Sequence, residues 1–368
     1  MQIKLNALKL KEMVSKAVKG ASLNKMIPLT ELMSIKAVNN TLILVTTDAT
    51  NYLYIKAGNV ECEDFEVVVK VDVFSKLVSK MTCETVTLDI DGDKLTVIGN
   101  GKYSIELPLD ENGALIKYPD PLVEFLHGPE MVHGPGMIPS TQIDLSAIKL
   151  ILATNSAALA TTLEVPCYTG YYIGDKIVTT DTYKICATKI PIFETPVLLN
   201  PEMVNLLDVM TAEKVICKRA DNKIVFTTPD CVVYGTVLAG IEDFAIDAIS
   251  NLVDEAFESS CKISKNEFLG VLDRLSLFVG DYDRNEITLT FTNEGILCSN
   301  KQQSGTEIIK YLDSKNFKDY TCTVDIVMLM SQVKAQQADS VEIWYGKPNA
   351  IKMVDGNVTQ IVALSEEE

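Results

Sequence analysis

The sequence predicts an α+β fold made of three repeated units, each with two helices against antiparallel sheets. A helical stretch followed by alternating strands begins near Val71, Asn200 and Val324. Another helical stretch precedes each of these, and short polar turns join the strands that follow. Two helices against a larger number of hairpin-connected strands are typical of an α+β domain.

The repeat is visible in matched residues. Residues 71–86 read VDVFSKLVSKMTCETV and residues 200–215 read NPEMVNLLDVMTAEKV, so both contain Met-Thr-x-Glu-x-Val at the same point. A third copy, VDIVMLMSQVKAQQADSV, begins at Val324. Thr-Thr-Asp recurs at Thr46 and Thr179, with a weaker Cys-Ser-Asn at Cys298. Chance similarity among amphipathic helices is the alternative explanation.

The opening helix of each unit is predicted over residues 8–20, 145–159 and 265–279. In the last of these, Phe268, Leu272, Leu275 and Val279 lie on one face. The predicted domains are residues 1–122, 141–245 and 261–368, joined by a Gly/Pro-rich linker (123–140) and an acidic linker (246–260).

Composition narrows the class of protein. The chain has 368 residues, a net charge of −17 and 47% hydrophobic residues, which is typical of a folded, soluble protein. No apolar run approaches the ~18 residues that cross a bilayer, and the N-terminus does not resemble a signal peptide. We therefore expect a cytoplasmic protein with no membrane partner. The net charge alone argues against binding to phosphate.

The distribution of charge weakens that argument. The first 30 residues contain six Lys and one Glu, a balance of +5, which leaves −22 for the other 338 residues. Lys76 and Lys80 continue the basic trend on a predicted helix. A basic helix face is ordinarily only solvated, but a positive track on one surface could also follow a phosphate backbone while the remaining surface repels it.

Cysteines and histidines carry no recognisable chemistry. The nine Cys include no C-x-x-C pair, so buried thiols in a reducing compartment are favoured over zinc or disulfides. His127 and His133 lie in HGPEMVHGPG without a third ligand nearby, so a surface loop is favoured over a metal pair. Catalytic and nucleotide-binding motifs are missing, and no cofactor, metal or catalytic residue is predicted.

An acidic stretch has calcium-loop spacing without the required residues. Asp89, Asp91 and Asp93 alternate, but Lys94 and Asn100 occupy the positions where an EF-hand needs Gly and Glu. Alternating apolar residues on both sides of Asp91 predict a hairpin instead.

Taken together, the sequence resembles the bacterial DNA sliding clamp, the beta subunit of DNA polymerase III. The resemblance rests on MQIKLNALKLKEMVSKAV, IPLTELMSIKA followed by LILVTTDATN, TTDTYKICATKI in the middle, and FLGVLDRLSLFVGDYDRNEITL at the start of the third unit. These segments span the chain in order. The departures from the family pattern indicate a divergent clamp of cellular, plasmid or phage origin.

The resemblance implies a ring of two chains, joined head to tail, around double-stranded DNA. Such a clamp is a processivity factor and not an enzyme; it tethers DNA polymerase and is loaded by a clamp loader. The helices would face the central hole and contact DNA without reading sequence. The candidate DNA-facing residues are Lys9, Lys16, Lys19, Lys25, Lys76, Lys80, Lys149, Lys265, Arg274 and Lys334.

The resemblance also implies two protein interfaces. Tyr103 and Ile105 would meet Phe278 and Val279 of the partner chain in the homodimer, although all four could instead be core or strand residues within one chain. The pocket shared by polymerase and loader peptides would include Tyr168, Thr180, Thr182, Tyr183, Lys184, Ile185, Glu242, Ile246, Asp247, Val362, Ala363, Leu364 and Ser365.

The implied pocket departs from the family pattern. Where the family favours Asp-Gly-His-Arg, this chain has Asp181-Thr182-Tyr183-Lys184, and it ends in IVALSEEE. The acids Glu242 and Asp247 would change the charge of the pocket, so the usual Gln-leading hydrophobic peptide would bind weakly or a more basic partner would replace it. A scaffold that has lost DNA loading, and a hydrolase that uses carboxylates and thiols, are the alternative functions.

Overall fold

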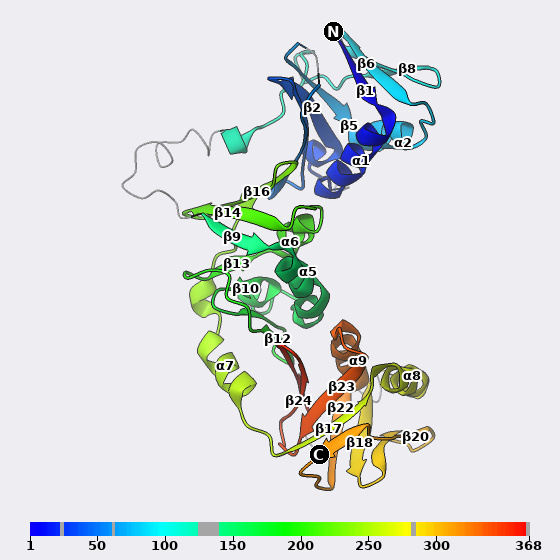
Figure 1. The fold of residues 1–368 in the computed structure, drawn as a ribbon, viewed down its shortest axis with the longest axis vertical. Helices are drawn as coiled ribbons and strands as arrows, with labels where there is room; N and C mark the ends of the chain where they lie inside the picture. The colour runs from blue at the N-terminus through cyan, green and yellow to red at the C-terminus, as the bar shows by residue number, and fades with distance from the viewer. Residues whose placement is uncertain (23–25, 61–62, 124–139, 281–284, 366–368) are drawn as a thin grey trace. The chain divides into compact units, whose positions relative to one another are not determined.

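The computed structural model describes residues 1–22, 26–60, 63–123, 140–280 and 285–365. The chain divides into two compact units (Figure 1). Unit 1 comprises Met1–Ser146 and Glu202–Val237, and unit 2 comprises Ala147–Pro201 and Leu238–Glu368. None of the helices in these described ranges has both the length and the apolar character needed to cross a bilayer.

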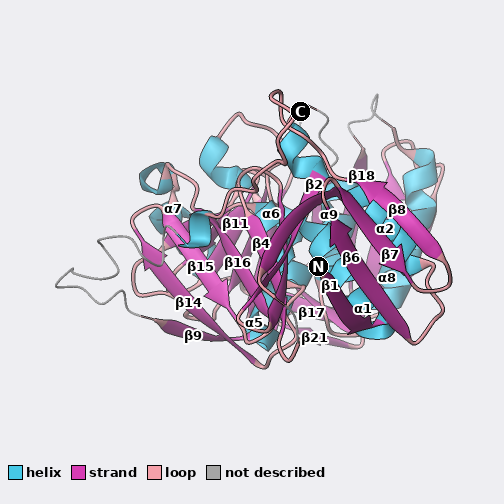
Figure 2. Cartoon of the chain, turned by 90° about the horizontal axis from the view of Figure 1, so that it is seen from above, coloured by secondary structure: helices cyan, strands magenta, loops and turns pink. Residues whose placement is uncertain are grey.

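Unit 1 contains two antiparallel sheets. Figure 2 shows the smaller one beside the N-terminus. Its strands, in spatial order, are β1 (Gln2–Asn6), β6 (Thr85–Asp91), β7 (Lys94–Ile98) and β8 (Lys102–Glu106). The larger sheet runs β5 (Phe65–Lys70), β2 (Leu32–Val38), β3 (Thr41–Thr47), β4 (Tyr52–Ala57), β16 (Cys231–Thr236), β15 (Lys223–Thr227), β14 (Lys214–Ala220) and β9 (Thr141–Asp144).

Unit 2 repeats this plan with one larger and one smaller sheet. The larger runs β13 (Val197–Leu199), β10 (Tyr171–Ile173), β11 (Ile177–Thr180), β12 (Lys184–Thr188), β25 (Val358–Ala363), β24 (Ala350–Asp355), β23 (Ser340–Tyr345), β17 (Ser259–Ser264) and β21 (Asp313–Lys315). The smaller runs β20 (Thr306–Ile309), β19 (Gly295–Asn300), β18 (Glu286–Thr292) and β22 (Tyr320–Asp325).

The predicted α+β class with antiparallel sheets is therefore confirmed. The division into three domains stays a prediction. Residues 141–245 contribute strands to both large sheets, because β16 pairs with β4 and β12 pairs with β25. Because each large sheet includes some of these strands, residues 141–245 are shared between the two compact units.

The predicted helices are present at all six repeat positions. The opening helices are α1 (Ala7–Ala17), α5 (Leu145–Thr154) and α8 (Lys265–Leu275), extended by the 3-10 helices η1 (Val18–Gly20), η3 (Asn155–Ala158) and η6 (Ser276–Phe278). The second helices are α2 (Val71–Ser79), α6 (Pro201–Leu207) and α9 (Ile326–Ala335). The hairpin predicted around Asp91 is also present, as β6 and β7.

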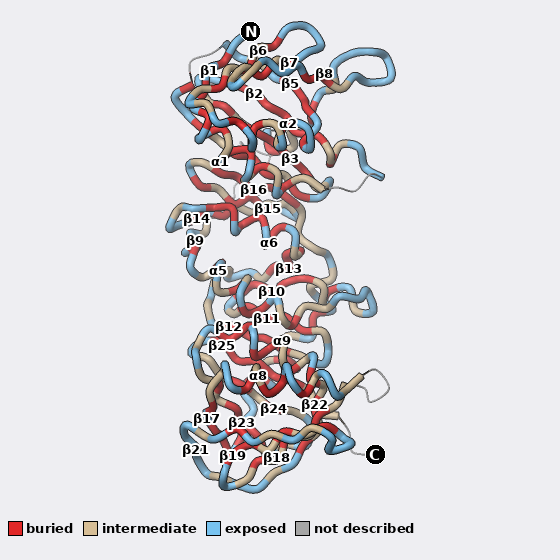
Figure 3. The backbone as a smooth tube through the Cα atoms, turned by 90° about the vertical axis from the view of Figure 1, so that its right-hand side faces the viewer, coloured by how far each residue is buried: buried red, intermediate tan, exposed pale blue. Residues whose placement is uncertain are grey.

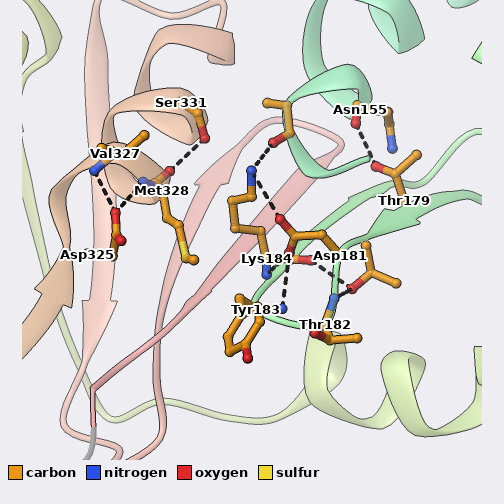
Figure 4. A network of polar contacts seen from close by, with 12 residues as sticks. Asn155, Thr179, Asp181, Thr182, Tyr183, Lys184, Asp325, Val327, Met328 and Ser331 are labelled. Carbon is orange, nitrogen blue, oxygen red and sulfur yellow. Dashed lines mark hydrogen bonds and ion pairs between the residues drawn. The ribbon is translucent and has the colours of Figure 1, made fainter. Parts of the chain in front are cut away.

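Polar residues at the ends of strands start several of these helices. Asn6 ends β1 and its side chain accepts a hydrogen bond from the Lys9 amide; Ser264 does the same for the Glu267 amide in α8. Asp325 caps α9 twice, at 2.7 Å from the Val327 amide and 2.9 Å from the Met328 amide (Figure 4). These caps satisfy amides that a helix leaves unpaired, so a strand can lead directly into a helix.

The acidic linker predicted over residues 246–260 contains a helix that the sequence analysis missed. This helix, α7 (Ile246–Asp254), has no side-chain cap at its N-terminus. Ile249 and Val253 are buried in a cluster that includes Phe244. Burial of one short apolar face stabilises a helix whose sequence has weak start signals.

The hydrophobic core follows the strands (Figure 3). In the third repeat, Phe268 and Leu272 of α8 and Leu329 and Val333 of α9 are fully buried against both sheets of that region. Val279, predicted on the same face as Phe268, is only partly buried. The opposite, exposed sides of the helices are left for the charged residues.

The Thr-Thr-Asp repeat has one structural role in both copies. The hydroxyl of the first Thr donates a hydrogen bond to a backbone carbonyl at the end of the opening helix. In the first copy Thr46 donates to the Ala17 carbonyl, and in the second Thr179 donates to the Asn155 carbonyl, each at 2.6 Å. The Asp carboxylate then accepts amide hydrogen bonds that close a tight turn, in the second copy from residues 183 and 184 (Figure 4). In the third copy, Asn300 donates to a carbonyl of η6.

Candidate DNA-facing helices and partner surface

The predicted DNA-facing cations lie on helices or at their ends. In unit 1, Lys9 and Lys16 lie in α1, Lys19 in η1, Lys76 in α2 and Lys80 at the C-cap of α2. In unit 2, Lys149 lies in α5, Lys265 and Arg274 in α8, and Lys334 in α9. Lys25 lies outside the described residues. The predicted helical placement is thus confirmed for nine of the ten, while their contact with DNA stays a prediction.

Five of these cations have a carboxylate within ion-pair distance. The pairs are Lys16–Asp230 at 3.2 Å, Lys19–Asp208 at 3.8 Å, Lys76–Asp72 at 2.6 Å, Arg274–Glu307 at 2.6 Å and Lys334–Asp273 at 3.9 Å. All ten side chains are partly or largely exposed. The positive charge of the helices is therefore locally balanced to an extent that the sequence analysis did not predict.

Two of the acids are held by more than one hydrogen bond. Asp230 accepts from Lys16 and, at 3.0 Å, from the Thr228 hydroxyl. Burial raises the pKa of Asp230, but these hydrogen bonds outweigh it and the pKa lies below its usual value. Glu307 accepts two hydrogen bonds, 2.8 and 2.6 Å long, from the Arg274 guanidinium, which lower the pKa of this carboxyl.

The other four described cations have no carboxylate partner in the described ranges. Lys9 donates to the Gly58 carbonyl at 3.3 Å, and Lys265 donates to carbonyls at the end of α9. Lys80 and Lys149 are exposed. These four carry the uncompensated positive charge of the predicted surface.

The predicted partner surface begins at the second Thr-Thr-Asp turn (Figure 4). The Asp181 carboxylate accepts from the amides of Tyr183 at 3.0 Å and Lys184 at 2.7 Å. The Lys184 ammonium lies 3.3 Å from the same carboxylate and 2.8 Å from the Ala157 carbonyl. Lys184 is therefore fixed inward, while Tyr183 is 60% exposed beside it.

Apolar side chains continue this surface. Tyr168 and Ile246 are half-buried and pack on a cluster that includes Ile185 and Phe244. The rings of Tyr168 and Phe244 meet edge to face, with centroids 5.2 Å apart. The structure thus brings Tyr168, Ile185 and Ile246 together in one cluster, while the binding of a partner there stays a prediction.

The C-terminal strand joins the same region through backbone hydrogen bonds. Lys184 is opposite Val362 in the β12–β25 ladder, and the Ala363 amide donates to the Tyr183 carbonyl at 2.8 Å. Val362 is fully buried in a different cluster, where Leu364 also packs. Ser365 donates its amide to the Thr323 carbonyl. Val362 therefore supports the surface and is not available to a ligand.

The predicted pocket residues differ in accessibility. Thr182, Tyr183, Glu242 and Asp247 are exposed, whereas Thr180 is as buried as Ile185. Phe244, which the sequence analysis missed, is the buried centre of the cluster. The available signal was an aromatic residue directly after the two acids of the segment IEDF, because an aromatic in an acidic stretch is well suited to anchor it to a core.

The predicted dimer residues lie near two sheet edges. Tyr103 is 43% exposed on β8, which ends the smaller sheet of unit 1, and Ile105 on the same strand is nearly buried. Phe278 is 51% exposed. A Cβ on Gly305, just before the edge strand β20, would lie 3.4 Å from the Phe278 ring. Phe278 and Val279 therefore lie next to the edge of the corresponding sheet in unit 2.

The cysteines in the described ranges are mostly buried. Seven of the eight described cysteines are buried and Cys83 is partly exposed. Burial raises the pKa of Cys217, Cys261 and Cys322 to about 12. No group of three or more potential ligands could hold a metal ion in the described part of the chain. His127 and His133 lie outside it.

Known proteins match this chain in two ways, by family at its N-terminal part and by fold over its whole length. Residues 1–112 match the family described as DNA polymerase III beta subunit, N-terminal domain. No curated protein matches the chain in sequence. Among solved structures, the Streptococcus pyogenes beta subunit (TM-score 0.85, 15% identity) and the Bacillus subtilis sliding clamp (0.82, 16%) match over 100% of both chains. A putative beta subunit from Eubacterium rectale matches over 99% of both (0.79, 18%).

The structural matches are too low in identity to show more than the fold, but they extend over all three repeats, beyond the segment that matches the family. The resemblance inferred from the sequence is confirmed: residues 1–112 match the N-terminal domain of the DNA polymerase III beta subunit family, and the whole chain has the fold of the bacterial sliding clamps.

Proposed function

We propose that this protein is a sliding clamp, a cytoplasmic processivity factor without catalytic activity that encircles duplex DNA and tethers a replicative polymerase. The observation that carries the proposal is the clamp fold over the whole chain, with the family match at its N-terminal domain. Three repeats in each chain, corresponding to residues 1–122, 141–245 and 261–368, would give a ring of six domains from two chains.

The helix cations support contact with the duplex. They are lysines on long stems, with one arginine. Contacts of this kind bind phosphates without reading bases, so neighbouring positions along the DNA have similar energies. A closed ring holds DNA by topology, so sliding needs only weak contacts. The acidic remainder of the protein would repel DNA outside the ring.

The edge strands support closure of the ring. In the described residues, β8 and β20 each have a neighbouring strand on one side only. Exposed edges favour pairing with another chain, and a head-to-tail dimer of this chain would pair β8 with the partner's β20. Tyr103 and Phe278 are exposed at these edges and would be buried by that pairing.

The apolar cluster of unit 2 supports a partner site for polymerase and clamp loader. Tyr168, Tyr183 and Ile246 offer partly exposed apolar surface, and Glu242 and Asp247 are exposed next to it. A short hydrophobic segment of the partner would dock there and raise the local concentration of polymerase at the primer end. The acids favour a segment that also carries Lys or Arg.

Topological binding is the property to test. The protein is loaded by the host clamp loader onto a nicked circular duplex, and free protein is removed by gel filtration. The complex is expected to survive moderate salt and to dissociate once a restriction enzyme linearises the circle. Equal retention on circular and linear DNA would contradict a closed ring.

Peptide binding tests the partner site separately. A hydrophobic peptide with a leading Gln and the same peptide extended by two Lys are compared by fluorescence anisotropy. The extended peptide is expected to bind more tightly, and Asp247→Asn is expected to reduce that advantage. Asp254→Asn, an equal charge change at the other end of α7, serves as the control. Equal affinity for both peptides would refute the charge preference.

A further inference from the structure

The ion pairs on the helices suggest a role for their acidic members. Five of the nine described cations on the proposed DNA-facing helices already have an anionic partner. In four of the five pairs the acid comes from another element, so helical spacing alone does not create them. Asp208 follows α6, Asp230 precedes β16, Asp273 lies in α8 opposite Lys334, and Glu307 lies in β20.

Stability alone does not explain these pairs. Exposed ion pairs contribute little to the free energy of folding. The Lys19–Asp208 pair is more than half exposed on both sides, and the Lys334–Asp273 pair is similar. A carboxylate is, however, a close chemical substitute for a phosphate oxygen. It occupies the same donors that a DNA backbone would use.

We propose that Asp208, Asp230, Asp273 and Glu307 act as resident competitors of DNA phosphate, which weaken each contact between the helices and the duplex. The inference rests on the proposed clamp function. A cation that leaves its carboxylate for a phosphate exchanges one anion for another and gains little. The net energy of each contact, and with it the barrier between neighbouring positions on the DNA, is therefore small.

The geometry predicts an order among the pairs. Arg274 is bound most firmly, because its guanidinium makes two short hydrogen bonds to Glu307. Lys19 and Lys334 lie 3.8 and 3.9 Å from their acids and exchange most readily. Removing Glu307 should consequently release more DNA-binding capacity than removing Asp208. Lys80 and Lys149 supply the contacts that need no exchange.

The test uses amide substitutions that keep side-chain shape. Asp208→Asn and Glu307→Gln are compared with Asp254→Asn and Glu342→Gln. The two controls make the same charge change at the Lys189–Asp254 and Lys315–Glu342 pairs, whose side chains have similar exposure but do not belong to these helices. Affinity for a short linear duplex is measured by anisotropy between about 50 and 200 mM salt, after thermal melts establish that each variant is folded.

The expected result is tighter binding by Asp208→Asn and Glu307→Gln, with the slope of log affinity against log salt steeper by up to about 0.9 for each released cation. The controls should keep the wild-type slope. In a Lys19→Gln background, Asp208→Asn should no longer steepen the slope. Equal steepening by the control variants, or none by Glu307→Gln, would overturn the proposal.

The salt-slope experiment can fail or succeed independently of the retention experiment on circular DNA. The proposed function is judged by retention of the wild-type protein on circular against linearised DNA. The role of the acids is judged by salt slopes on a short linear duplex, where no ring is needed. Loss of topological retention, together with the steeper salt slopes expected for Asp208→Asn and Glu307→Gln, would refute the clamp and leave phosphate competition supported.

Discussion

Thr182 occupies a backbone conformation that its side chain disfavours. Its φ is +79°, and Ala49 at the same position of the first Thr-Thr-Asp turn has φ +82°. Left-handed backbone is uncommon for residues other than Gly and is least suited to a β-branched residue such as Thr. The turn is maintained because Asp181 binds the amides of the two residues that follow Thr182.

Thr182→Gly is therefore expected to stabilise unit 2. Relief of left-handed strain, about 1–2 kcal/mol, exceeds the entropic cost of Gly in the unfolded chain and leaves a gain of about 0.5–1 kcal/mol. Urea unfolding followed by circular dichroism measures it. Thr182→Ala keeps a Cβ and should gain less. A loss of stability in Thr182→Gly would mean that the Thr side chain makes a stabilising contact larger than the strain.

Asp120 connects the segment 114–122 to the larger sheet of unit 1. Its carboxylate pairs with Lys36 and accepts from the Tyr54 hydroxyl at 3.0 Å. Lys36 is largely buried, so Asp120→Ala would leave an unpaired ammonium, at a cost of about 2–3 kcal/mol after allowing for its partial exposure.

Tyr54→Phe is the matched control for Asp120→Ala in thermal and urea unfolding. It removes a single hydrogen bond to the same carboxylate and should cost about 1 kcal/mol. If both variants lose the same stability, the Lys36–Asp120 pair contributes nothing beyond the tyrosine hydrogen bond.

Sequence spacing predicted some residue roles and not others. The Thr-Thr-Asp match was visible because both copies use the same local turn and the same bond to the preceding helix. The ion pairs of Lys16, Lys19 and Arg274 were not predictable, because each acid is brought near only by tertiary structure. Local patterns report local hydrogen bonds and miss long-range charge partners.

At the scale of elements, periodicity predicted six helices and failed for α7. The six have apolar residues at helical spacing, and three begin at a side-chain cap. Helix α7 has neither a capping side chain nor a basic residue, and its burial against Phe244 depends on the fold. Its acids predicted a linker, whereas residues 246–254 form a helix.

The N-caps of α9 and α8 differ in the number of helix amides that they bind. Asp325 accepts two amide hydrogen bonds, whereas Ser264 at the start of α8 accepts one of 3.4 Å. Asp325→Ala is expected to cost about 1–2 kcal/mol, because two helix amides lose their acceptor and the favourable charge at the N-terminus is lost. Ser264→Ala should cost less. The unfolding free energy in urea measures both, and a larger loss for Ser264→Ala would contradict the geometric ranking.

At the scale of the whole molecule, the fold and the repeat followed from sequence because three copies reinforce one another. Interfaces did not follow in the same way. The residues expected at the dimer contact are a mixture of exposed and nearly buried side chains, so chain-internal packing explains Ile105 but leaves Tyr103 and Phe278 without a buried role. In the described residues these two aromatics lie at or beside the outer strands β8 and β20, where the proposed dimer would bury them.

Phe278→Asp together with Val279→Asp is accordingly expected to convert the proposed dimer to monomers. Light scattering should give about twice 40.5 kDa for the wild type and about 40.5 kDa for the variant. The reason is that two carboxylates at the edge beside β20 would have to be desolvated against the apolar face of the partner's β8, which costs several kcal/mol for each unpaired charge. Leu163→Asp adds a single carboxylate at another exposed apolar residue and should leave the mass unchanged. The variant should also lose retention on circular DNA while keeping its melting transition, because each chain has its own core. If the variant remained dimeric at low concentration, the interface would not lie at these edges.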